Sequence, residues 1–275
     1  MRLCKYCALG NDYWILDPQN CSEMSPQEIR SFCDRHWGLG GDGILYGPKQ
    51  KEHTSEFFVD IYNADGTLAE ISGNGLTIFS RYLWDQQYIK LNQSFAIIPS
   101  QSCKVQASCV SQNKQIVSEI ILGKGHVEAV LDYPVAQEFQ EKFSLPSVLK
   151  LYKVNIGNPH CVAPVGKVSR TLAEALGPIL EQHPTFPQKT NVQFVAYDLE
   201  ASYAQLEIWE RGSGYTLGSG SSSCAVACAL SHLKNKINTI FTLNMPGGQL
   251  TVHNNQNTFS FSNIACKVAE IEIHR

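Results

Sequence analysis

The chain of 275 residues is 43% hydrophobic and 17% charged, which is typical of a globular protein and excludes a disordered or fibrous one. A chain of this length can form two compact cores. The formal net charge is −3 and there is no Lys/Arg block, so neither nucleic acid nor a membrane is expected as a partner. The first residues contain no apolar signal core, so we expect a cytoplasmic protein.

The 10 cysteines are scattered along the chain. Without a secretory signal they are expected to be reduced thiols, most of them buried. Cys4 and Cys7 have the spacing of a metal or redox pair, but no second such pair and no histidine pair completes a zinc site. The sequence therefore predicts no metal site.

Short strands alternate with a few helices along the chain. Strands are expected at 3–6, 14–16, 57–62, 95–98, 104–109, 115–122, 151–156, 192–197, 204–209, 240–245, 249–253, 258–262 and 266–273. Helices are expected after Ser25, over 75–85, around 172–180 and around 226–233. This strand-rich pattern predicts an α+β fold of two similar halves, with a loose boundary near residues 115–120.

The first helix has a clear start signal. Ser25 is a suitable N-cap, Pro26 fits the first helical position, and Glu28 can close a capping box. We expect this helix to end near His36-Trp37-Gly38. The stretch 38–43 formally matches the G-x-G-x-x-G fingerprint, but a helix precedes it and a strand follows, which is the reverse of a dinucleotide site. A glycine-rich turn is therefore predicted there.

Two stretches, 63–75 and 210–222, repeat one pattern. A strand-like run ends in a polar residue, and a Ser-Gly pair follows nine residues later (63 to 72 and 210 to 219). An apolar segment with helical spacing comes next. Ser72 and Ser219 are therefore expected at the N-termini of two helices, one in each half. Such a pair suits a two-sided site in which each half presents one small side chain to a ligand.

Several polar residues close to these repeats can carry chemistry. Arg211 could hold a carboxylate through two parallel hydrogen bonds. Asparagines at strand ends offer neutral donors and acceptors, which suits a zwitterionic ligand; they are Asn11, Asn63, Asn158 and Asn191. His160 and Glu210 are candidate acid/base groups. The alternative is that the asparagines cap turns and the histidine has a structural hydrogen bond.

A serine hydrolase is not favoured. The nucleophile elbow has the form G-x-S-x-G. Here glycine directly follows Ser72 and Ser219, and neither serine has a glycine two residues before it.

Spaced motifs follow one another along the chain: Gly10-Asn11-Asp12, Cys33-Asp34-Arg35-His36, Asn63-Ala64-Asp65-Gly66, Gly73-Asn74-Gly75, Gly157-Asn158-Pro159-His160, Asn191-Val192-Gln193-Phe194 and Trp209-Glu210-Arg211-Gly212. In this order they resemble the diaminopimelate epimerase family along nearly the whole chain. The resemblance implies two pseudo-symmetric halves, each a mixed or antiparallel sheet wrapped around a central helix, with the active site in the cleft between them. The halves are expected to be 1–117, joined by the last strand at 264–275, and 118–263.

The resemblance also implies an isomerase. The family interconverts LL- and meso-diaminopimelate in lysine and peptidoglycan-precursor biosynthesis, without pyridoxal phosphate or another cofactor, and its members commonly form homodimers. Two cysteines act from opposite faces of the α-carbon, one removing a proton while the other delivers one. A thiol with a pKa of about 8.5 can do this near neutral pH when a helix N-terminus lowers its pKa. The same N-terminus can bind the substrate carboxylate.

The sequence departs from the family at the two cysteines, which correspond to Ser72 and Ser219. Ser221-Ser222-Ser223 also replaces the Thr-Gly-Ala run that usually follows the second cysteine. Because an alcohol is much less acidic than a thiol, each change is expected to slow proton transfer on the order of a hundredfold to ten-thousandfold. Two explanations compete: an engineered double replacement, which we favour, and natural divergence to a binding protein or slow enzyme. Serine as a simple N-cap is the remaining alternative.

Residues and resemblance together predict one site. Ser72 and Ser219 occupy the acid/base positions, with Glu210 and His160 as supporting catalytic groups. The residues expected to bind substrate are Asn11, Asn63, Gly73, Asn74, Asn158, Asn191, Glu210, Arg211, Gly220 and Ser221. Racemisation of another amino acid such as glutamate or proline, and amino-acid binding without catalysis, are the alternative functions.

Overall fold

The protein is described by a computed structural model over residues 2–50, 55–69 and 71–273. The chain forms two compact units. The first unit consists of Met1–Ile121 with Ser262–Arg275, and the second of Leu122–Phe261. The sequence predicts this division after residue 117, with the chain returning at 264.

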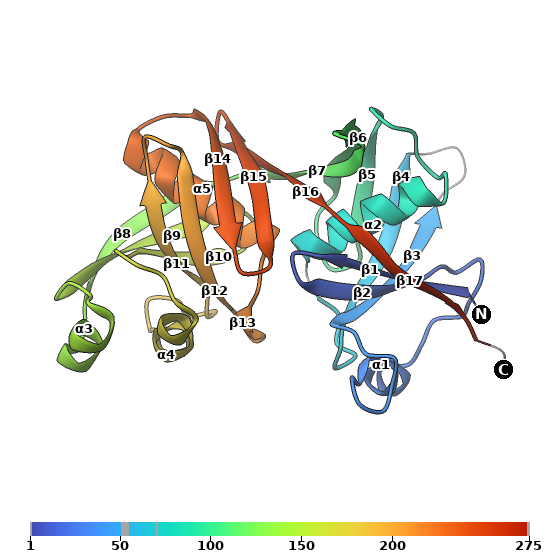
Figure 1. The fold of residues 1–275 in the computed structure, drawn as a ribbon, viewed down its shortest axis with the longest axis horizontal. Helices are drawn as coiled ribbons and strands as arrows, with labels where there is room; N and C mark the ends of the chain where they lie inside the picture. Colours follow the sequence, from blue (N-terminus) through green and yellow to red (C-terminus); the bar gives the residue numbers. More distant parts are fainter. Residues whose placement is uncertain (1, 51–54, 70, 274–275) are drawn as a thin grey trace. The chain divides into compact units, whose positions relative to one another are not determined.

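The first unit contains helices α1 and α2 and the strands around them (Figure 1). Its elements are β1 (Arg2–Ala8), β2 (Asn11–Leu16), α1 (Pro26–Cys33), β3 (Gly43–Gln50), β4 (Glu56–Asn63), α2 (Gly73–Asp85), β5 (Ser94–Pro99), β6 (Val105–Gln112), most of β7 (Gln115–Lys124) and β17 (Cys266–Glu272). The turn between β1 and β2 consists of Leu9 and Gly10, both with positive φ. Asn11 therefore begins a strand and is not part of the turn.

The second unit contains helices α3, α4 and α5. Its elements are β8 (His126–Pro134), α3 (Gln137–Phe143), β9 (Val148–Asn155), β10 (Pro159–Pro164), α4 (Arg170–Glu181), β11 (Asn191–Asp198), β12 (Tyr203–Glu210), β13 (Gly214–Thr216), α5 (Gly220–Lys234), β14 (Asn238–Met245), β15 (Gly248–Asn255) and the first part of β16 (Thr258–Ile264).

Strand pairing follows the same sequence of directions in both units. In the first, β17–β1 and β1–β2 are antiparallel, β2–β3 is parallel, β3–β4 is antiparallel, β4–β5 is parallel and β5–β6 is antiparallel. In the second, β8–β9, β9–β10, β10–β11, β11–β12, β12–β14 and β14–β15 repeat that order. The predicted α+β fold of two pseudo-symmetric halves is thereby confirmed.

One helix fills the core of each unit. Helix α2 packs on β1, β2, β3 and β6, and α5 packs on β8–β11, β14 and β15 (Figure 1). Both helices are buried on nearly all sides over their first turns, as expected for a central helix. Each begins ten residues after an equivalent strand ends (63 to 73 after β4, 210 to 220 after β12). The repeated sequence pattern therefore corresponds to a repeated strand-turn-helix unit.

The start of α1 is as predicted, with both hydrogen bonds of the Ser25–Glu28 capping box present. Its predicted end near His36-Trp37-Gly38 is wrong, because α1 ends at Cys33. Asp34 adopts an extended backbone, and its carboxylate accepts the backbone N–H groups of His36 and Trp37, each at 2.7 Å. This local turn replaces the last helical turn. The glycine-rich turn and the strand after it, β3, are confirmed.

Strands β10 and β13 and helix α3 were not predicted; candidate strands were expected between Lys124 and Phe143, where the structure has β8 and then α3. Strand β10 is a parallel neighbour of β11 and carries four consecutive buried residues, so it lacks the alternation of a half-exposed strand.

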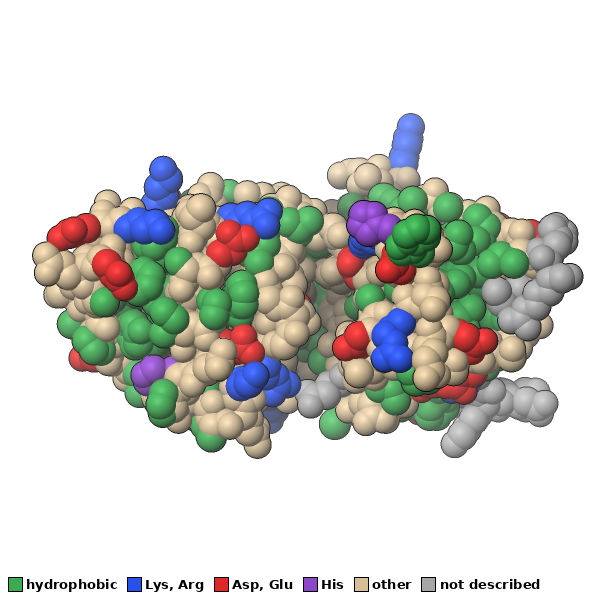
Figure 2. Space-filling view, turned by 90° about the horizontal axis from the view of Figure 1, so that it is seen from below, with side chains coloured by type: hydrophobic (Ala, Val, Ile, Leu, Met, Phe, Trp, Pro, Cys, Tyr) green, Lys and Arg blue, Asp and Glu red, His purple; other side chains and the backbone are tan. Residues whose placement is uncertain are grey.

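Charged side chains of both signs are dispersed over the face shown in Figure 2, in keeping with the small net charge. Within the described part of the chain, no helix has both the length and the apolar character required to cross a membrane.

Candidate active site

The first half-site lies at the N-terminus of α2, where Ser72 is the N-cap. Its backbone is extended, and its Oγ accepts the backbone N–H of Gly75 at 3.0 Å. The Tyr13 hydroxyl, on β2, donates to the same Oγ at 3.4 Å. A Cβ on Gly75 would lie 3.1 Å from the Ser72 Cβ, so glycine leaves room for the serine to fold back on the helix. The predicted position of Ser72 as a helix N-cap is confirmed.

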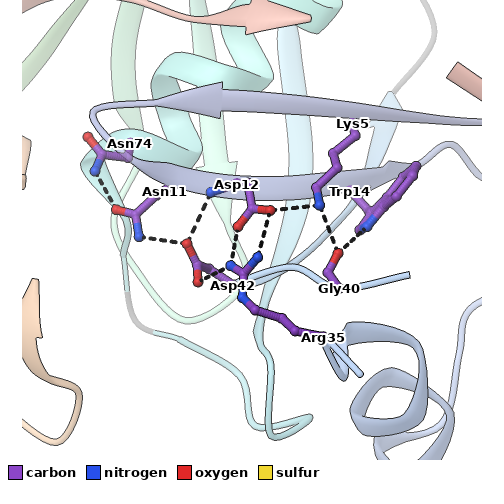
Figure 3. Close-up of polar contacts among 8 residues, drawn as sticks. All are labelled: Lys5, Asn11, Asp12, Trp14, Arg35, Gly40, Asp42 and Asn74. Atoms are coloured by element: carbon purple, nitrogen blue, oxygen red, sulfur yellow. Dashed lines mark hydrogen bonds and ion pairs between the residues drawn. The ribbon is translucent and has the colours of Figure 1, made fainter. Parts of the chain in front are cut away.

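Two predicted binding residues meet beside this cap. Asn74, in the first turn of α2, donates through Nδ2 to Oδ1 of Asn11 at 2.5 Å. Asn11 in turn donates through its Nδ2 to Oδ2 of Asp42 at 3.1 Å. Figure 3 shows this chain of amide contacts running from the helix to the glycine-rich turn. Because the Asp42 carboxylate can only accept, it must face the NH2 group of Asn11, and the oxygen of Asn11 therefore faces Asn74.

A charged network lies behind Asn11 (Figure 3). Arg35 binds both oxygens of Asp12, at 2.6 and 3.3 Å, and Oδ1 of Asp42 at 2.9 Å. Lys5 lies 2.7 Å from Asp12 and donates to the Gly40 carbonyl at 3.0 Å. Burial opposes ionisation of Asp12, but the hydrogen bonds from Arg35 and Lys5 outweigh it and lower its pKa. Asp12 is therefore a carboxylate at neutral pH, held by two cations.

Asn63 occupies a different local setting at the end of β4. Its Nδ2 donates to Oγ1 of Thr67 at 3.0 Å, and its backbone N–H donates to the Thr67 carbonyl at 2.8 Å. Its side-chain amide is thus engaged within its own turn. Gly73 is buried in the first turn of α2, directly after Ser72.

The second half-site lies at the N-terminus of α5, where Ser219 is the N-cap and is nearly buried. Its Oγ accepts the Ser222 backbone N–H at 3.4 Å and lies 3.3 Å from the Ser221 hydroxyl. The Ser219 side chain also influences the carboxyl of Glu210, the last residue of β12. Burial raises the pKa of the Glu210 carboxyl, and the interaction with Ser219 offsets part of that rise. A carboxyl of raised pKa beside a capping hydroxyl is suited to proton transfer.

His160 is completely buried beneath this half-site. Its Nε2 lies 2.9 Å from Oδ1 of Asn158, and its Nδ1 accepts from Nε2 of Gln193 at 3.1 Å. The carbonyl oxygen of Asn158 assigns the ring proton to Nε2. Burial lowers the pKa of His160 to about 3, with a smaller contribution from Arg211 opposed by the Gln193 hydrogen bond. The ring is therefore neutral at physiological pH, and both of its nitrogens are occupied.

Asn191 joins two loops of the second half-site. Its Nδ2 donates to the Pro159 carbonyl at 3.1 Å, and its Oδ1 accepts the backbone N–H of Arg211 at 3.1 Å. The Arg211 guanidinium donates to the Gln188 carbonyl at 3.3 Å. Asn191 thus holds the backbone of Arg211 in place, in addition to any contact with a ligand.

Gly220 follows Ser219 and packs against an aromatic ring. A Cβ at this position would lie 2.6 Å from Cζ of the buried Phe261. Only glycine allows this approach without displacing the ring. Ser221 is the next residue of α5 and is half-buried.

Strand register identifies matching positions in the two half-sites. Gly43 of β3 and Asn191 of β11 occupy equivalent positions in the two units. Gly43 pairs with Tyr13 of β2 and with Asn63 of β4, and Asn191 pairs with His160 of β10. Val192 pairs with Trp209, so Asn191 aligns with Glu210. Tyr13 therefore matches His160, and Asn63 matches Glu210.

Sequence reasoning missed three residues that contact these sites: Tyr13, Gln193 and Ser222. Gln193 donates to His160 and, at 3.0 Å, to the Ser222 hydroxyl. The repeat itself could have identified Tyr13, which follows Asn11 by two residues as His160 follows Asn158. Within the described ranges, no cluster of three or more His, Cys, Asp or Glu side chains is placed to hold a metal ion.

Comparison with known proteins places this geometry in context. The sequence profile of the family described as diaminopimelate epimerase matches residues 3–128 and 152–263. The chain is 40% identical over 258 residues to diaminopimelate epimerase 2 of Nostoc sp. strain PCC 7120, covering 92% of this chain and 88% of that protein.

Solved structures share the fold at low identity. A predicted epimerase from Pseudomonas aeruginosa superposes with a TM-score of 0.72 at 16% identity, covering 99% of this chain and 98% of the other. A hydroxyproline epimerase from Agrobacterium vitis, solved with trans-4-hydroxy-L-proline, gives a TM-score of 0.72 at 14% identity, covering 98% and 91%.

Proposed function

The chain belongs to the diaminopimelate epimerase family, and from that premise we propose that it binds diaminopimelate and interconverts its LL and meso forms. This would serve lysine and peptidoglycan-precursor biosynthesis and would need no cofactor. The observation that carries the proposal is the repeated N-cap: Ser72 and Ser219 both cap the central helix of their unit. In the proposed reaction they act on opposite faces of one α-carbon.

The roles of the surrounding groups follow from their chemistry. A helix N-terminus has free N–H groups and a partial positive charge, so the N–H groups at Gly73, Gly220 and Ser221 are suited to the substrate α-carboxylate. The same groups stabilise the negative charge that develops when the α-proton leaves. Asn11 and Asn74 in the first unit, and the residues Asn158, Asn191 and Arg211 in the second, are proposed to hold the amino and carboxylate groups. Asn63 is proposed to bind the substrate in the same way.

Glu210 is the proposed partner of Ser219 in proton transfer. Its raised pKa makes the carboxylate a better base than an exposed glutamate, and the Ser219 side chain interacts with this carboxyl. His160 supports the site as a neutral ring that fixes Asn158 and, through Gln193, the Ser222 hydroxyl. Glu210 therefore carries the acid/base role and His160 the supporting one.

We also propose that Ser72 and Ser219 stand where the family carries cysteine. A serine hydroxyl is far less acidic than a thiol, so proton removal by serine is slow even at a helix N-terminus. Engineered replacement and natural divergence both lead to a slow or silent enzyme that still binds its substrate. The experiment below does not depend on which of the two occurred.

The decisive experiment follows the α-proton. The protein is incubated with LL-diaminopimelate in deuterated water, and the α-proton signal is recorded by NMR over time. Exchange with solvent supports a slow epimerase, whereas saturable binding without exchange supports an amino-acid-binding protein. A Ser72→Cys/Ser219→Cys double variant should exchange at least about a hundredfold faster. If the folded double variant binds diaminopimelate and still shows no exchange, the epimerase proposal is wrong.

A second candidate is racemisation of another amino acid. The hydroxyproline epimerase above has the same fold, although likeness at this identity shows the fold alone. The asparagine-rich half-sites suit a second polar head group, which proline lacks. Glutamate, proline and trans-4-hydroxy-L-proline in the same exchange assay separate the candidates, because only the true substrate should exchange in the double cysteine variant.

A further inference from the structure

Glu181, the last residue of α4, contacts both ends of the segment that carries Glu210 and Arg211. Its Oε2 accepts the indole Nε1–H of Trp209 at 2.7 Å, and its Oε1 accepts the backbone N–H of Gly212 at 3.2 Å. The side chain is almost buried, with a residue exposure of 6%. One carboxylate thus bridges the residues immediately before and after the proposed site pair.

Further hydrogen bonds hold the main chain between Trp209 and Gly212, the two residues that Glu181 contacts. Asn191 accepts the Arg211 backbone N–H at 3.1 Å. A turn then closes through the Ser213 backbone N–H, which donates to the Glu210 carbonyl at 3.1 Å. Gly212 within this turn has a φ of +77°, a conformation that suits glycine. Hydrogen bonds therefore constrain the main chain on both sides of Arg211.

Helix α4 is held close to the segment by packing. A Cβ on Gly177 would lie 2.6 Å from Cγ of Trp209, so the indole lies directly on the helix backbone. The only cation within 4 Å of the Glu181 carboxylate, among the residues the structure describes, is Lys189, with its Nζ at 3.8 Å. The hydrogen-bond partners of the Glu181 carboxylate are thus mainly two N–H donors. The carboxylate is held in place because Glu181 is the last residue of α4.

The chemistry of these contacts requires a carboxylate. Both partners of Glu181 are donors, and an ionised carboxylate has two acceptor oxygens and no donor. A glutamine of the same shape has one acceptor oxygen, and its NH2 group would face a second donor. Removal of one acceptor leaves a buried N–H without a partner, which is costly.

We propose that Glu181 is a positioning residue of the second half-site, which fixes Trp209 and Gly212 so that Glu210 meets Ser219 and Arg211 meets the substrate carboxylate. This inference rests on the proposed function for its ligand, but not for its geometry. It gives α4 a role in the site, although Glu181 itself touches no reacting atom. The competing interpretation is that Glu181 only stabilises the fold.

The test compares Glu181→Gln with a control on the same helix, Glu174→Gln. Glu174 forms an exposed ion pair with Arg170 at 2.8 Å, one helical turn apart. Two readouts are used: amide and indole N–H signals in a nitrogen-correlated NMR spectrum, and the calorimetric Kd for LL-diaminopimelate. In Glu181→Gln we expect the Trp209 indole, Gly212, Glu210 and Arg211 signals to shift and the Kd to rise about tenfold. Glu174→Gln should change neither readout.

Two outcomes overturn the proposal, and a third separates it from the proposed function. Unmoved signals of Glu210 and Arg211 in Glu181→Gln overturn positioning, whether or not the ligand binds. Shifted signals with an unchanged Kd reduce Glu181 to a structural role. If the unchanged protein binds no diaminopimelate, the proposed function fails, while the ligand-free spectra still decide the geometry.

A second variant covers the case in which Glu181→Gln does not fold. Trp209→Phe keeps an aromatic ring on Gly177 and removes the indole donor to Glu181, together with the part of the indole that lies near Gly214. The Gly212 and Arg211 signals should shift, and the Kd should rise a few fold, about threefold. Unmoved signals or an unchanged Kd in this variant also overturn the proposal.

Discussion

In the first unit Ser72 caps α2 next to the Tyr13 hydroxyl, whereas in the second Ser219 caps α5 next to the Glu210 carboxyl. The strand pairings that lead to the two caps are the same, but the matching strand ends differ. The first unit has Asn63 where the second has Glu210. Among the residues that the structure describes, a carboxyl group therefore lies beside the capping serine in the second unit, whereas a tyrosine hydroxyl lies there in the first.

The layers beneath the two caps also differ. In the second unit, Gln193 donates to both the Ser222 hydroxyl and the buried ring of His160. At the matching place in the first unit, Gly75 faces Leu45, and a Cβ at Gly75 would lie 3.4 Å from Cδ2 of Leu45. Neutral polar groups can be buried completely when they are hydrogen-bonded, and such groups lie beneath the cap of the second unit.

The first unit instead orients Asn11 through ions. Asp42 and Asp12 are bound by Arg35, whose side chain is 54% exposed. One backbone plan thus supports a buried neutral network in one unit and a partly exposed charged network in the other. We therefore expect the two half-sites to respond differently to the same substitution.

Cysteine placed in one unit at a time tests this difference most strongly. Ser219→Cys alone should speed α-proton exchange on the order of a hundredfold, because Glu210 can take up the thiol proton. Ser72→Cys alone should gain less, since its neighbours are a tyrosine hydroxyl and amides. Deuterium exchange from LL- and meso-diaminopimelate, measured separately for each variant, provides the comparison. Equal gains in both variants would show that Glu210 does not distinguish the half-sites.

The buried ring of His160 predicts a pH effect specific to the second unit. Its pKa is about 3 when folded, against an ordinary value of 6.5. Between these values the unfolded chain binds a proton that the folded chain does not, so stability falls as the pH drops below 6.5. The free energy of unfolding should fall by roughly 2 kcal/mol between about pH 6.5 and about pH 5 through this group.

Denaturant unfolding followed by circular dichroism across this pH range measures the effect. His160→Gln should flatten the acid side of the stability curve, because glutamine can bond Asn158 and Gln193 without titrating. His126→Gln changes an exposed histidine of β8 and serves as the control. A curve for His160→Gln as steep as that of the unchanged protein would contradict the buried neutral ring.

Local signals explain which parts of this architecture the sequence could predict. The capping box at Ser25 and Glu28 lies within four residues, so the start of α1 was predictable. Ser72 and Ser219 were predictable as caps because a Ser-Gly pair precedes an apolar helical run in both repeats. The end of α1 was missed because the Asp34 side chain binds the backbone N–H groups that follow it and so competes with the helix. The spacing of apolar residues gives no sign of this competition.

Contacts between distant residues account for what was missed in the site. Asn11 was recognised as a polar strand-end residue, but its bond to Asn74 joins residues 63 positions apart. Glu181 reads in the sequence as an ordinary acidic residue near a helix end, and its partners Trp209 and Gly212 follow it by about 30 positions. Such partners become apparent only once α4 packs against β12.

The charged network of the first unit should be sensitive to loss of one carboxylate. Asp42 accepts from the Asn11 side chain, the Asp12 backbone N–H and Arg35, which are all donors. In Asp42→Asn the new NH2 group must face either Arg35, at Oδ1, or the Asn11 and Asp12 donors, at Oδ2, so at least one contact of the network that holds Asn11 is lost. We expect calorimetry to show about tenfold weaker binding of diaminopimelate.

Asp60→Asn is the matched control for that variant. Asp60 lies on β4 in the same unit and pairs with Lys49 at 2.5 Å, and none of the contacts that fix Asn11 involves it. Equal losses of affinity in both variants would mean that net charge is responsible. An unchanged affinity in Asp42→Asn would remove Asp42 from the site.

The smallest predicted effect asks whether the two serines do more than cap their helices. Ser169 caps α4 by accepting the Leu172 N–H at 3.2 Å, and Ser25 caps α1 in the same way. Replacing any capping serine with alanine should lower the free energy of unfolding by about 1 kcal/mol. Ser219→Ala and Ser72→Ala should also weaken diaminopimelate binding in calorimetry, whereas Ser169→Ala and Ser25→Ala should not. If all four variants lose the same stability and none loses affinity, Ser72 and Ser219 are ordinary caps, and the repeated hydroxyls have no part in binding.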